Sequence, residues 1–274
     1  MKIVKEQVLM DYLLQNYNRT KAKNLLKYKE VQVNGKIVTQ YDYALKIGDN
    51  ITISKSVPSS LPFDIIYEDH ECIVINKPSG LLSERTAKES KRTAYMMVKN
   101  YVKKKHEQLY LVHRLDQDTS GVLMFVKDKK LYEYLTHHWN ACVTTRSYYA
   151  VVEGKMNGSG TIDNYLAESR GQEVYITKKG GQRAITHYQT IVSSQKCSLV
   201  HVLLDTGRKN QIRVHMASLH HPIMGDKKYG ARSNALKRLA LHADTFSFIH
   251  PFTHKEMTFT TDIPESFEKV VKKH

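Results

Sequence analysis

The segment His113–Gly121, which reads His-Arg-Leu-Asp-Gln-Asp-Thr-Ser-Gly, guides the interpretation of the rest of the chain. Apolar runs flank it at Leu109–Val112 and at Val122–Val126. A short polar segment between two such runs predicts a turn at the edge of a sheet. From Asp118 onward it has ordinary turn chemistry, namely side chains that bond the local backbone and then a glycine that tolerates positive φ. Asp116 precedes that turn, so turn formation alone does not require its carboxylate.

The composition indicates a globular protein with a polyanionic partner. The chain has 274 residues, of which 41% are hydrophobic, enough for one large domain or two unequal ones. Its 42 lysine and arginine residues outnumber 27 aspartate and glutamate residues, and the net charge of +15 favours nucleic acid as the partner. We expect no membrane span and no signal peptide. The three cysteines are far apart in the sequence, which is typical of reduced, buried residues in a cytoplasmic protein.

The first 54 residues form a small unit of their own. Leu9, Tyr12 and Leu13 recur at helical spacing, and Thr20 is expected to cap a second helix. Val31–Gly35 reads Val-Gln-Val-Asn-Gly, which predicts a β-hairpin. The second helix is strongly basic, and we expect four of its side chains to bind RNA: Arg19, Lys21, Lys23 and Lys27.

The order of these elements resembles the alpha-L RNA-binding domain, which occurs in a ribosomal protein and in several RNA-modifying enzymes. The resemblance covers residues 5–53. Residues 55–62 have the composition of a linker. We therefore expect an RNA-binding domain over 1–54, a linker over 55–62 and a catalytic domain over 63–274.

The larger unit alternates strand-like and helix-like segments. Many strands with several helices between them predict a mixed α/β (α+β) fold, with a mostly antiparallel sheet and flanking helices. One helix is expected to start at Thr206, with Asn210 and Arg213 on the same face one turn apart.

Several common chemistries have no motif in this sequence. There is no P-loop, no dinucleotide-binding glycine motif, no paired zinc-ligand set and no nucleophile elbow. Carboxylates, arginines and tyrosines remain, in three stretches that complement one another: Arg114 with Asp116, Arg146 with Tyr148, and Arg208 with Asn210 and Arg213. An ionised aspartate can act as a nucleophile, and an arginine within about 4–6 Å keeps it ionised. A tyrosine ring can stack on a flipped base.

Four ordered segments, the last with an extension, resemble the RluA-type family of RNA pseudouridine synthases. His113–Gly121 is similar to the H-R-L-D-x-x-T-S-G motif, and Tyr67–Gly80 to the strand and N-K-P-x-G loop that open the family's domain. Arg146–Gly154 is similar to its K-x-Y-x-A-x-V-x-G segment. Leu204–His215 and His221–Gly230 are similar to its L-x-T-G-R-x-H-Q-I-R-x-H block and the H-P-I-x-G-D-x-x-Y-G extension. The match runs from about residue 64 to residue 265.

This resemblance implies a role for each matched residue. Asp116 would be the catalytic nucleophile, and Arg213 would pair with its carboxylate. Tyr148 would stack on the target uracil, and Leu204 would form an apolar wall of the pocket. Arg114 would hold the flipped-out nucleotide or fill the gap that it leaves. His113 and His215 are expected to pack or to donate and accept hydrogen bonds.

The sequence departs from the family pattern at two positions. Arg146 stands where lysine is usual, which keeps the charge but changes its geometry. Asn210 stands where histidine is usual. Asparagine cannot act as an acid or base at neutral pH, although it still donates and accepts hydrogen bonds.

The implied reaction turns uridine into pseudouridine without redox change or net hydrolysis, so we expect no cofactor and no metal. The implied partner is structured RNA, with ribosomal RNA favoured over transfer RNA, and no obligate protein partner is expected. Two alternatives stay open. One is a metal-dependent nuclease that uses Asp116, Asp118 and His113 as ligands. The other is a non-catalytic RNA assembly factor with the same fold.

Overall fold

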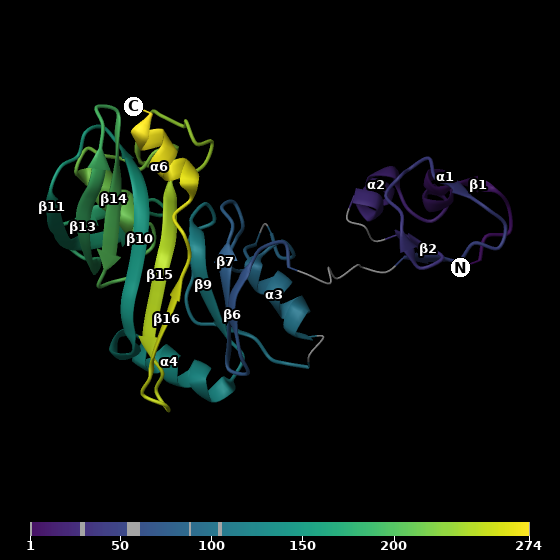
Figure 1. The fold of residues 1–274 in the computed structure, drawn as a ribbon, viewed down its shortest axis with the longest axis horizontal. Coiled ribbons are helices and arrows are strands. Elements are labelled where there is room, and N and C mark those ends of the chain that lie inside the picture. The colour runs from purple at the N-terminus through teal and green to yellow at the C-terminus, as the bar shows by residue number, and fades with distance from the viewer. Residues whose placement is uncertain (1, 28–30, 54–60, 88, 104–105, 274) are drawn as a thin grey trace. The chain divides into compact units, whose positions relative to one another are not determined.

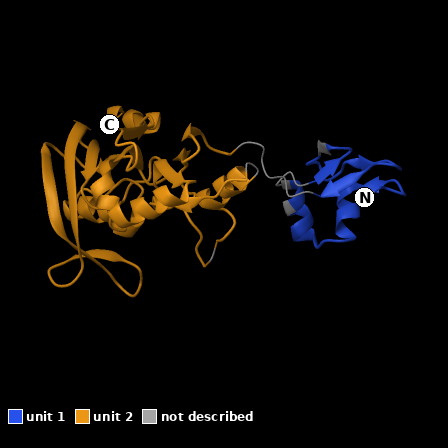
Figure 2. Cartoon of the chain, turned by 90° about the horizontal axis from the view of Figure 1, so that it is seen from below, with its two compact units in different colours: residues 1–60 blue, residues 61–274 orange. Residues whose placement is uncertain are grey.

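The computed structural model describes residues 2–27, 31–53, 61–87, 89–103 and 106–273. The chain divides into two compact units, Met1–Ser60 and Leu61–His274, which Figure 2 colours separately. Most of the predicted linker lies outside the described residues.

The smaller unit packs two helices on short strands. The helices are α1 (Leu9–Leu14) and α2 (Arg19–Lys27). The strands are β1 (Gln7–Val8), β2 (Val31–Val33), β3 (Lys36–Ile37), β4 (Ala44–Leu45) and β5 (Ile51–Ile53). β2 pairs with β3 and β5, and β1 pairs with β4. The buried faces of both helices join one apolar cluster with these strands, which gives this small unit its own core.

Local sequence explains the turns of this unit, with one correction. The predicted hairpin is confirmed, because Asn34 and Gly35 both adopt positive φ between β2 and β3. The predicted cap of α2 at Thr20 is wrong. The helix already begins at Arg19, and the Asn18 side chain accepts a hydrogen bond of 2.9 Å from the Lys21 backbone N–H.

An eleven-stranded sheet dominates the larger unit (Figure 1). Along the sheet the strands follow the order β12-β11-β13-β14-β10-β15-β9-β7-β6, with β16 beside β15 and β8 beside β9. The strands are β6 (Ile65–Glu68), β7 (Cys72–Lys77), β8 (Tyr110–Leu111), β9 (Ser120–Val126), β10 (Val143–Glu153), β11 (Ser159–Glu168), β12 (Val174–Thr177), β13 (Gln182–Ser193), β14 (Cys197–Leu204), β15 (Leu241–Ile249) and β16 (Glu256–Thr260). The β15–β9 pair is parallel and the other pairs are antiparallel, so the predicted fold class is confirmed.

Helices cover the sheet on both faces around β9. The helices are α3 (Ala94–Lys103), α4 (Lys129–Cys142), α5 (Gln211–Ser218) and α6 (Glu265–Lys272), with a short 3-10 turn η1 (Lys227–Tyr229). Every residue of β9 is buried, which explains the continuous apolar run after the key segment. Leu123 and Phe125 join the apolar cluster that contains α3 residues, and Met124 joins the cluster that contains α4 residues.

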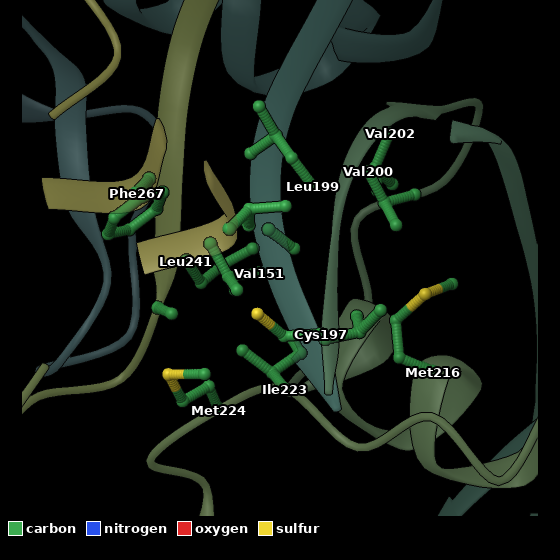
Figure 3. Packing of buried hydrophobic residues seen from close by; sticks show 14 of the residues in the cluster. Val151, Cys197, Leu199, Val200, Val202, Met216, Ile223, Met224, Leu241 and Phe267 are labelled. Atoms are coloured by element: carbon green, nitrogen blue, oxygen red, sulfur yellow. The ribbon is translucent and has the colours of Figure 1, made fainter. Parts of the chain in front are cut away.

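A further apolar cluster supports the part of the sheet beneath α5 and α6. Figure 3 shows Val151 of β10 and Val200 of β14 in this cluster, with Met216 of α5 and Phe267 of α6. Cys197 belongs to the same cluster, and all three cysteines are buried and unpaired. Within the described ranges, no helix has the length and apolar character needed to cross a membrane.

The predicted start of α5 at Thr206 is wrong, because the helix begins at Gln211. Asn210 adopts the left-handed conformation, with φ 53°, and this ends a loop that precedes the helix. The Gln211 side chain organises that loop. Its Oε1 accepts hydrogen bonds from the Thr206 hydroxyl and the Arg208 backbone N–H, while its Nε2 donates to β13 at Ile185.

Candidate active site

The key segment forms a tight turn that leads into β9. The Thr119 backbone N–H donates to the Asp116 carbonyl oxygen at 3.2 Å, which places Asp116 at the first position of the turn. Gly121, with φ 115°, lies where the parallel strand β15 approaches β9. A β-carbon there would lie 2.0 Å from the carbonyl oxygen of Ala243, so no side chain can be accommodated at this position.

Two buried side chains hold the backbone on either side of Asp116. Lys77 is fully buried, and its Nζ donates to the carbonyl oxygens of Pro78, Leu81 and Gln117 at 2.7–3.1 Å. Burial lowers the pKa of Lys77 to about 7, an effect that the nearby Asp118 and Asp116 oppose. Three carbonyl acceptors match the three N–H bonds of the ammonium form. The second side chain is Ser83, whose hydroxyl accepts from the Leu115 backbone N–H and donates to the Leu115 carbonyl.

A pocket opens beside Asp116 and gathers the predicted site residues. Its lining includes side chains from the key turn, from β10, from the end of β14 and from α5. All five residues that the sequence assigned to the nucleophile and the uridine line it: Arg114, Asp116, Tyr148, Leu204 and Arg213.

The strongest partner of Arg213 is Asp226, which the sequence did not single out. Arg213 Nε and Nη2 donate to the two carboxylate oxygens of Asp226 at 2.7 and 2.8 Å. The Asp226 side chain is 1% exposed. Arg213 Nη1 lies 3.7 Å from Asp116 Oδ2, which is ion-pair distance but longer than a hydrogen bond. Asp226 raises the pKa of Arg213 against the opposing effect of burial, so the guanidinium is charged.

Asn210 and Tyr229 complete the surroundings of this guanidinium. Asn210 Oδ1 accepts a hydrogen bond of 2.8 Å from Arg213 Nη1, and Asn210 Nδ2 donates to the Tyr229 hydroxyl at 3.0 Å. The Arg213 guanidinium carbon lies 5.0 Å from the centre of the Tyr229 ring. The side chain at the position of the family's usual histidine therefore contacts the arginine that faces Asp116.

Tyr148 and the two arginines of the earlier stretches have different surroundings. Burial raises the pKa of Tyr148 to about 12, so its hydroxyl is protonated at neutral pH. Arg114 is exposed and forms an ion pair with Glu84 at the pocket rim. Arg146 Nη2 donates to the Asp205 carbonyl oxygen, whereas its buried Nε has no hydrogen-bond partner within the part of the chain that the structure describes.

The two histidines pack and form hydrogen bonds, as predicted. His113 Nε2 accepts from the Met124 backbone N–H at 3.0 Å, and the ring stacks on Phe246 with centroids 4.7 Å apart. Burial lowers the pKa of His113 to about 3, and the nearby Arg146 charge adds to this effect. His215 is buried and bonds Thr186 and Asn164 through its two ring nitrogens.

The geometry does not support the predicted alternative of a metal site at Asp116, Asp118 and His113. The His113 Nε2 lone pair is occupied by a backbone N–H, as described above. Among the described residues, the only group with metal-ligand spacing is Asp69, His70 and Glu71 in the β6–β7 turn. The Asp69 carboxylate already accepts hydrogen bonds from Tyr67 and from backbone N–H groups.

The four basic residues that the sequence assigned to RNA contact lie on α2. Arg19 and Lys23 are one turn apart and line a cavity together with Leu14 and Tyr41, which are both exposed. The Lys21 Nζ lies 4.7 Å from the ring centre of Tyr17. The side chain of Lys27, the fourth predicted RNA contact, lies outside the described residues.

Comparison with known proteins agrees with this geometry. Residues 71–218 match the family described as RNA pseudouridylate synthase, and residues 7–51 match the S4 domain. This chain belongs to the RNA pseudouridine synthase family. Its members are isomerases, and the N-terminal RNA-binding domain expected from the sequence is confirmed as an S4 domain.

Relatives in the synthase family match almost the whole chain. The chain is 34% identical to the uncharacterised RNA pseudouridine synthase YjbO of Bacillus subtilis, over 89% of this chain and 90% of the relative. It is 30% identical to ribosomal large subunit pseudouridine synthase D of Zymomonas mobilis, over 95% and 90% respectively. The structure of human RNA pseudouridylate synthase domain containing 4 has the same fold, with a TM-score of 0.60 at 24% identity, over 74% of this chain and 90% of the human chain.

Proposed function

We propose that this synthase isomerises uridine in structured RNA, with ribosomal RNA as its substrate class and Asp116 as its nucleophile. The observation that carries the proposal is the pocket itself, in which the Asp116 carboxylate faces the charged guanidinium of Arg213. A nearby cation keeps a carboxylate ionised, which is the form that acts as a nucleophile.

The reaction exchanges one bond of the base for another. The bond between uracil N1 and the ribose anomeric carbon breaks, the ring turns, and a bond from uracil C5 to the same carbon forms. The proton on C5 is then lost to water, and N1 gains one, so atoms and electrons balance. Asp116 can attack the anomeric carbon, add to the uracil ring or remove a ribose proton, and each route uses its ionised form.

The remaining pocket residues hold the flipped uridine. Tyr148 offers its ring face to the uracil, and Leu204 offers an apolar wall. Arg114 is exposed at the rim, where it pairs with Glu84. On RNA binding it can leave Glu84 and either bind a phosphate of the flipped nucleotide or fill the gap that this nucleotide leaves in the RNA helix. The positions of these side chains support the roles that the family resemblance implies.

RNA affinity comes from basic surfaces outside the pocket. The S4 domain contributes α2, with Arg19, Lys21, Lys23 and Lys27 as its RNA contacts. Relatives named for the large ribosomal subunit favour ribosomal RNA over transfer RNA as the substrate. Three unpaired cysteines support a reducing compartment, the cytoplasm.

The test is a pseudouridine map of ribosomal and transfer RNA from a wild-type strain, a deletion strain and the deletion strain that expresses Asp116→Asn. We expect at least one ribosomal uridine to lose its modification on deletion, and Asp116→Asn not to restore it. Loss confined to transfer RNA would contradict the substrate class. An unchanged map would contradict the enzymatic role and favour a non-catalytic assembly factor.

A further inference from the structure

A second cavity lies beside the pocket and is strongly basic. It has a volume of about 700 Å³, and Arg213 belongs to the lining of both hollows. Four further cations line the second cavity: Lys227, Lys228, Lys237 and Arg238. We propose that this cavity binds backbone phosphates of the RNA strand next to the target uridine. The inference rests on the proposed function, because it names how the substrate of that same site is held.

Four of the five cations that line this cavity are not neutralised by the protein. Within the described ranges, none of the four forms an ion pair with a carboxylate, although Lys228 Nζ donates to the Gln172 carbonyl oxygen. Two carboxylates line the cavity, Asp118 and Asp226. Asp226 is buried and bound by Arg213, so only the exposed Asp118 opposes an anion there. A concave site with uncompensated positive charge attracts phosphates.

The walls of the cavity are held close together by backbone contacts. The Gly225 backbone N–H donates to the Ser233 carbonyl oxygen at 2.9 Å. Gly225 has φ 85°, and a β-carbon there would lie 2.2 Å from the Arg238 carbonyl oxygen. On the opposite wall, Arg238 is fixed by hydrogen bonds to Ser120 and to backbone carbonyls. The two segments that carry these cations are therefore held next to each other, so the cations line one preformed cavity.

The position of the cavity identifies its occupant. A uridine in the pocket stays attached to its neighbours, so the strand must leave past a side chain that lines the pocket. Arg213 is such a side chain, and the cavity that shares it with the pocket is also lined by Lys227 and Lys237, both exposed. Phosphate contacts position a strand without reading its bases. The cavity would thus contribute affinity and register, not uridine recognition.

The experiment compares two full-length double variants with equal charge loss. Lys227→Gln with Lys237→Gln alters the cavity, while Lys130→Gln with Lys273→Gln removes two exposed lysines that line neither hollow. RNA affinity is measured by filter binding over a range of salt, and single-turnover pseudouridine formation is measured at saturating enzyme. The RNA is an unmodified transcript that contains the target uridine.

We expect the cavity variant to bind about tenfold more weakly at low salt. The slope of log affinity against log salt should fall by roughly 1.4, which is about 0.7 for each lost phosphate contact. The control should keep the wild-type slope, and both variants should keep the saturating rate. Equal slopes for the two variants would overturn the proposal. If the cavity variant shows the expected lower slope but wild type forms no pseudouridine, the phosphate-binding role of the cavity would be supported and the proposed function would fail.

Discussion

At the scale of single residues, the site is built around one guanidinium shared by two carboxylates. The Arg213 fork binds Asp226 bidentately and leaves Nη1 for Asn210 and Asp116. We therefore expect Asp226 to be a positioning residue, since its link to Asp116 runs through Arg213. Bidentate pairs of this kind fix orientation as well as charge. Asn210 accepts a hydrogen bond from Arg213 Nη1, and a residue without acid–base chemistry is sufficient for this contact.

The positioning role of Asp226 predicts a loss of rate rather than of RNA affinity. In Asp226→Asn the fork loses one charged acceptor, so we expect the saturating rate to fall at least about tenfold. The half-saturating RNA concentration should change little. The saturating rate should fall less in Asn210→Ala, which removes a single hydrogen bond to Arg213. Asp163→Asn is the matched control, because it breaks an ion pair with Arg183 that lies outside the pocket lining. A wild-type rate in folded Asp226→Asn would contradict this role.

Local patterns predicted the turn that holds Asp116 but not the buried side chains that support it. Asp116, Tyr148 and Arg213 were identified because each belongs to a motif whose residue types carry chemistry. Asp226 belongs to the His221–Gly230 segment, yet its contact with the Arg213 guanidinium, thirteen residues away in the sequence, is not revealed by spacing alone. Lys77 likewise bonds a carbonyl forty residues away, in the key turn. The available signal in the sequence was a lysine that follows the apolar run Cys72–Ile75 and directly precedes Pro-Ser-Gly.

At the scale of elements, α5 carries Arg213 and is anchored by buried polar groups rather than by an apolar face alone. His215 and Gln211 both bond Thr186 of β13. This anchoring also explains the wrong helix start at Thr206. The Gln211 side chain accepts the hydrogen bond of the Arg208 backbone N–H, so the loop needs no helical hydrogen bond there. The spacing of apolar residues gives no sign of such a contact.

The buried His215 predicts a loss of stability in acid. Burial lowers its pKa from 6.5 to about 4. Below about pH 6.5 His215 is protonated in the unfolded chain, whereas in the folded chain it stays neutral down to about pH 4. The free energy of unfolding therefore falls as pH drops through this window. At about pH 5 the loss from this residue is about 2 kcal/mol.

The measurement is urea unfolding of wild type and His215→Gln at about pH 8 and about pH 5. The glutamine variant has lower stability at both values but should lose about 2 kcal/mol less than wild type between them. Parallel losses in the two proteins would show that His215 does not titrate in this way.

At the scale of the whole molecule, sequence predicted the two units, the sheet class and the family. Ordered motifs over most of the chain predicted the family, and the Asn-Gly hairpin with the basic helix predicted the N-terminal RNA-binding domain; the comparisons confirm both. The strand order could not be predicted, because β9 pairs with the distant strand β15 through a glycine contact that no local pattern encodes. The proposed function is also divided at this scale, since the proposed chemistry lies in one pocket, whereas basic side chains occur in both units.

Because of this division, Asp116→Asn can separate chemistry from binding and so decide whether Asp116 is the nucleophile of a uridine isomerase. The full-length variant and wild type are compared on the same ribosomal RNA transcript, with affinity and pseudouridine formation measured together. The variant should bind as wild type does, because its basic surfaces are unchanged, and should form no pseudouridine. Turnover near the wild-type rate in Asp116→Asn would contradict the account.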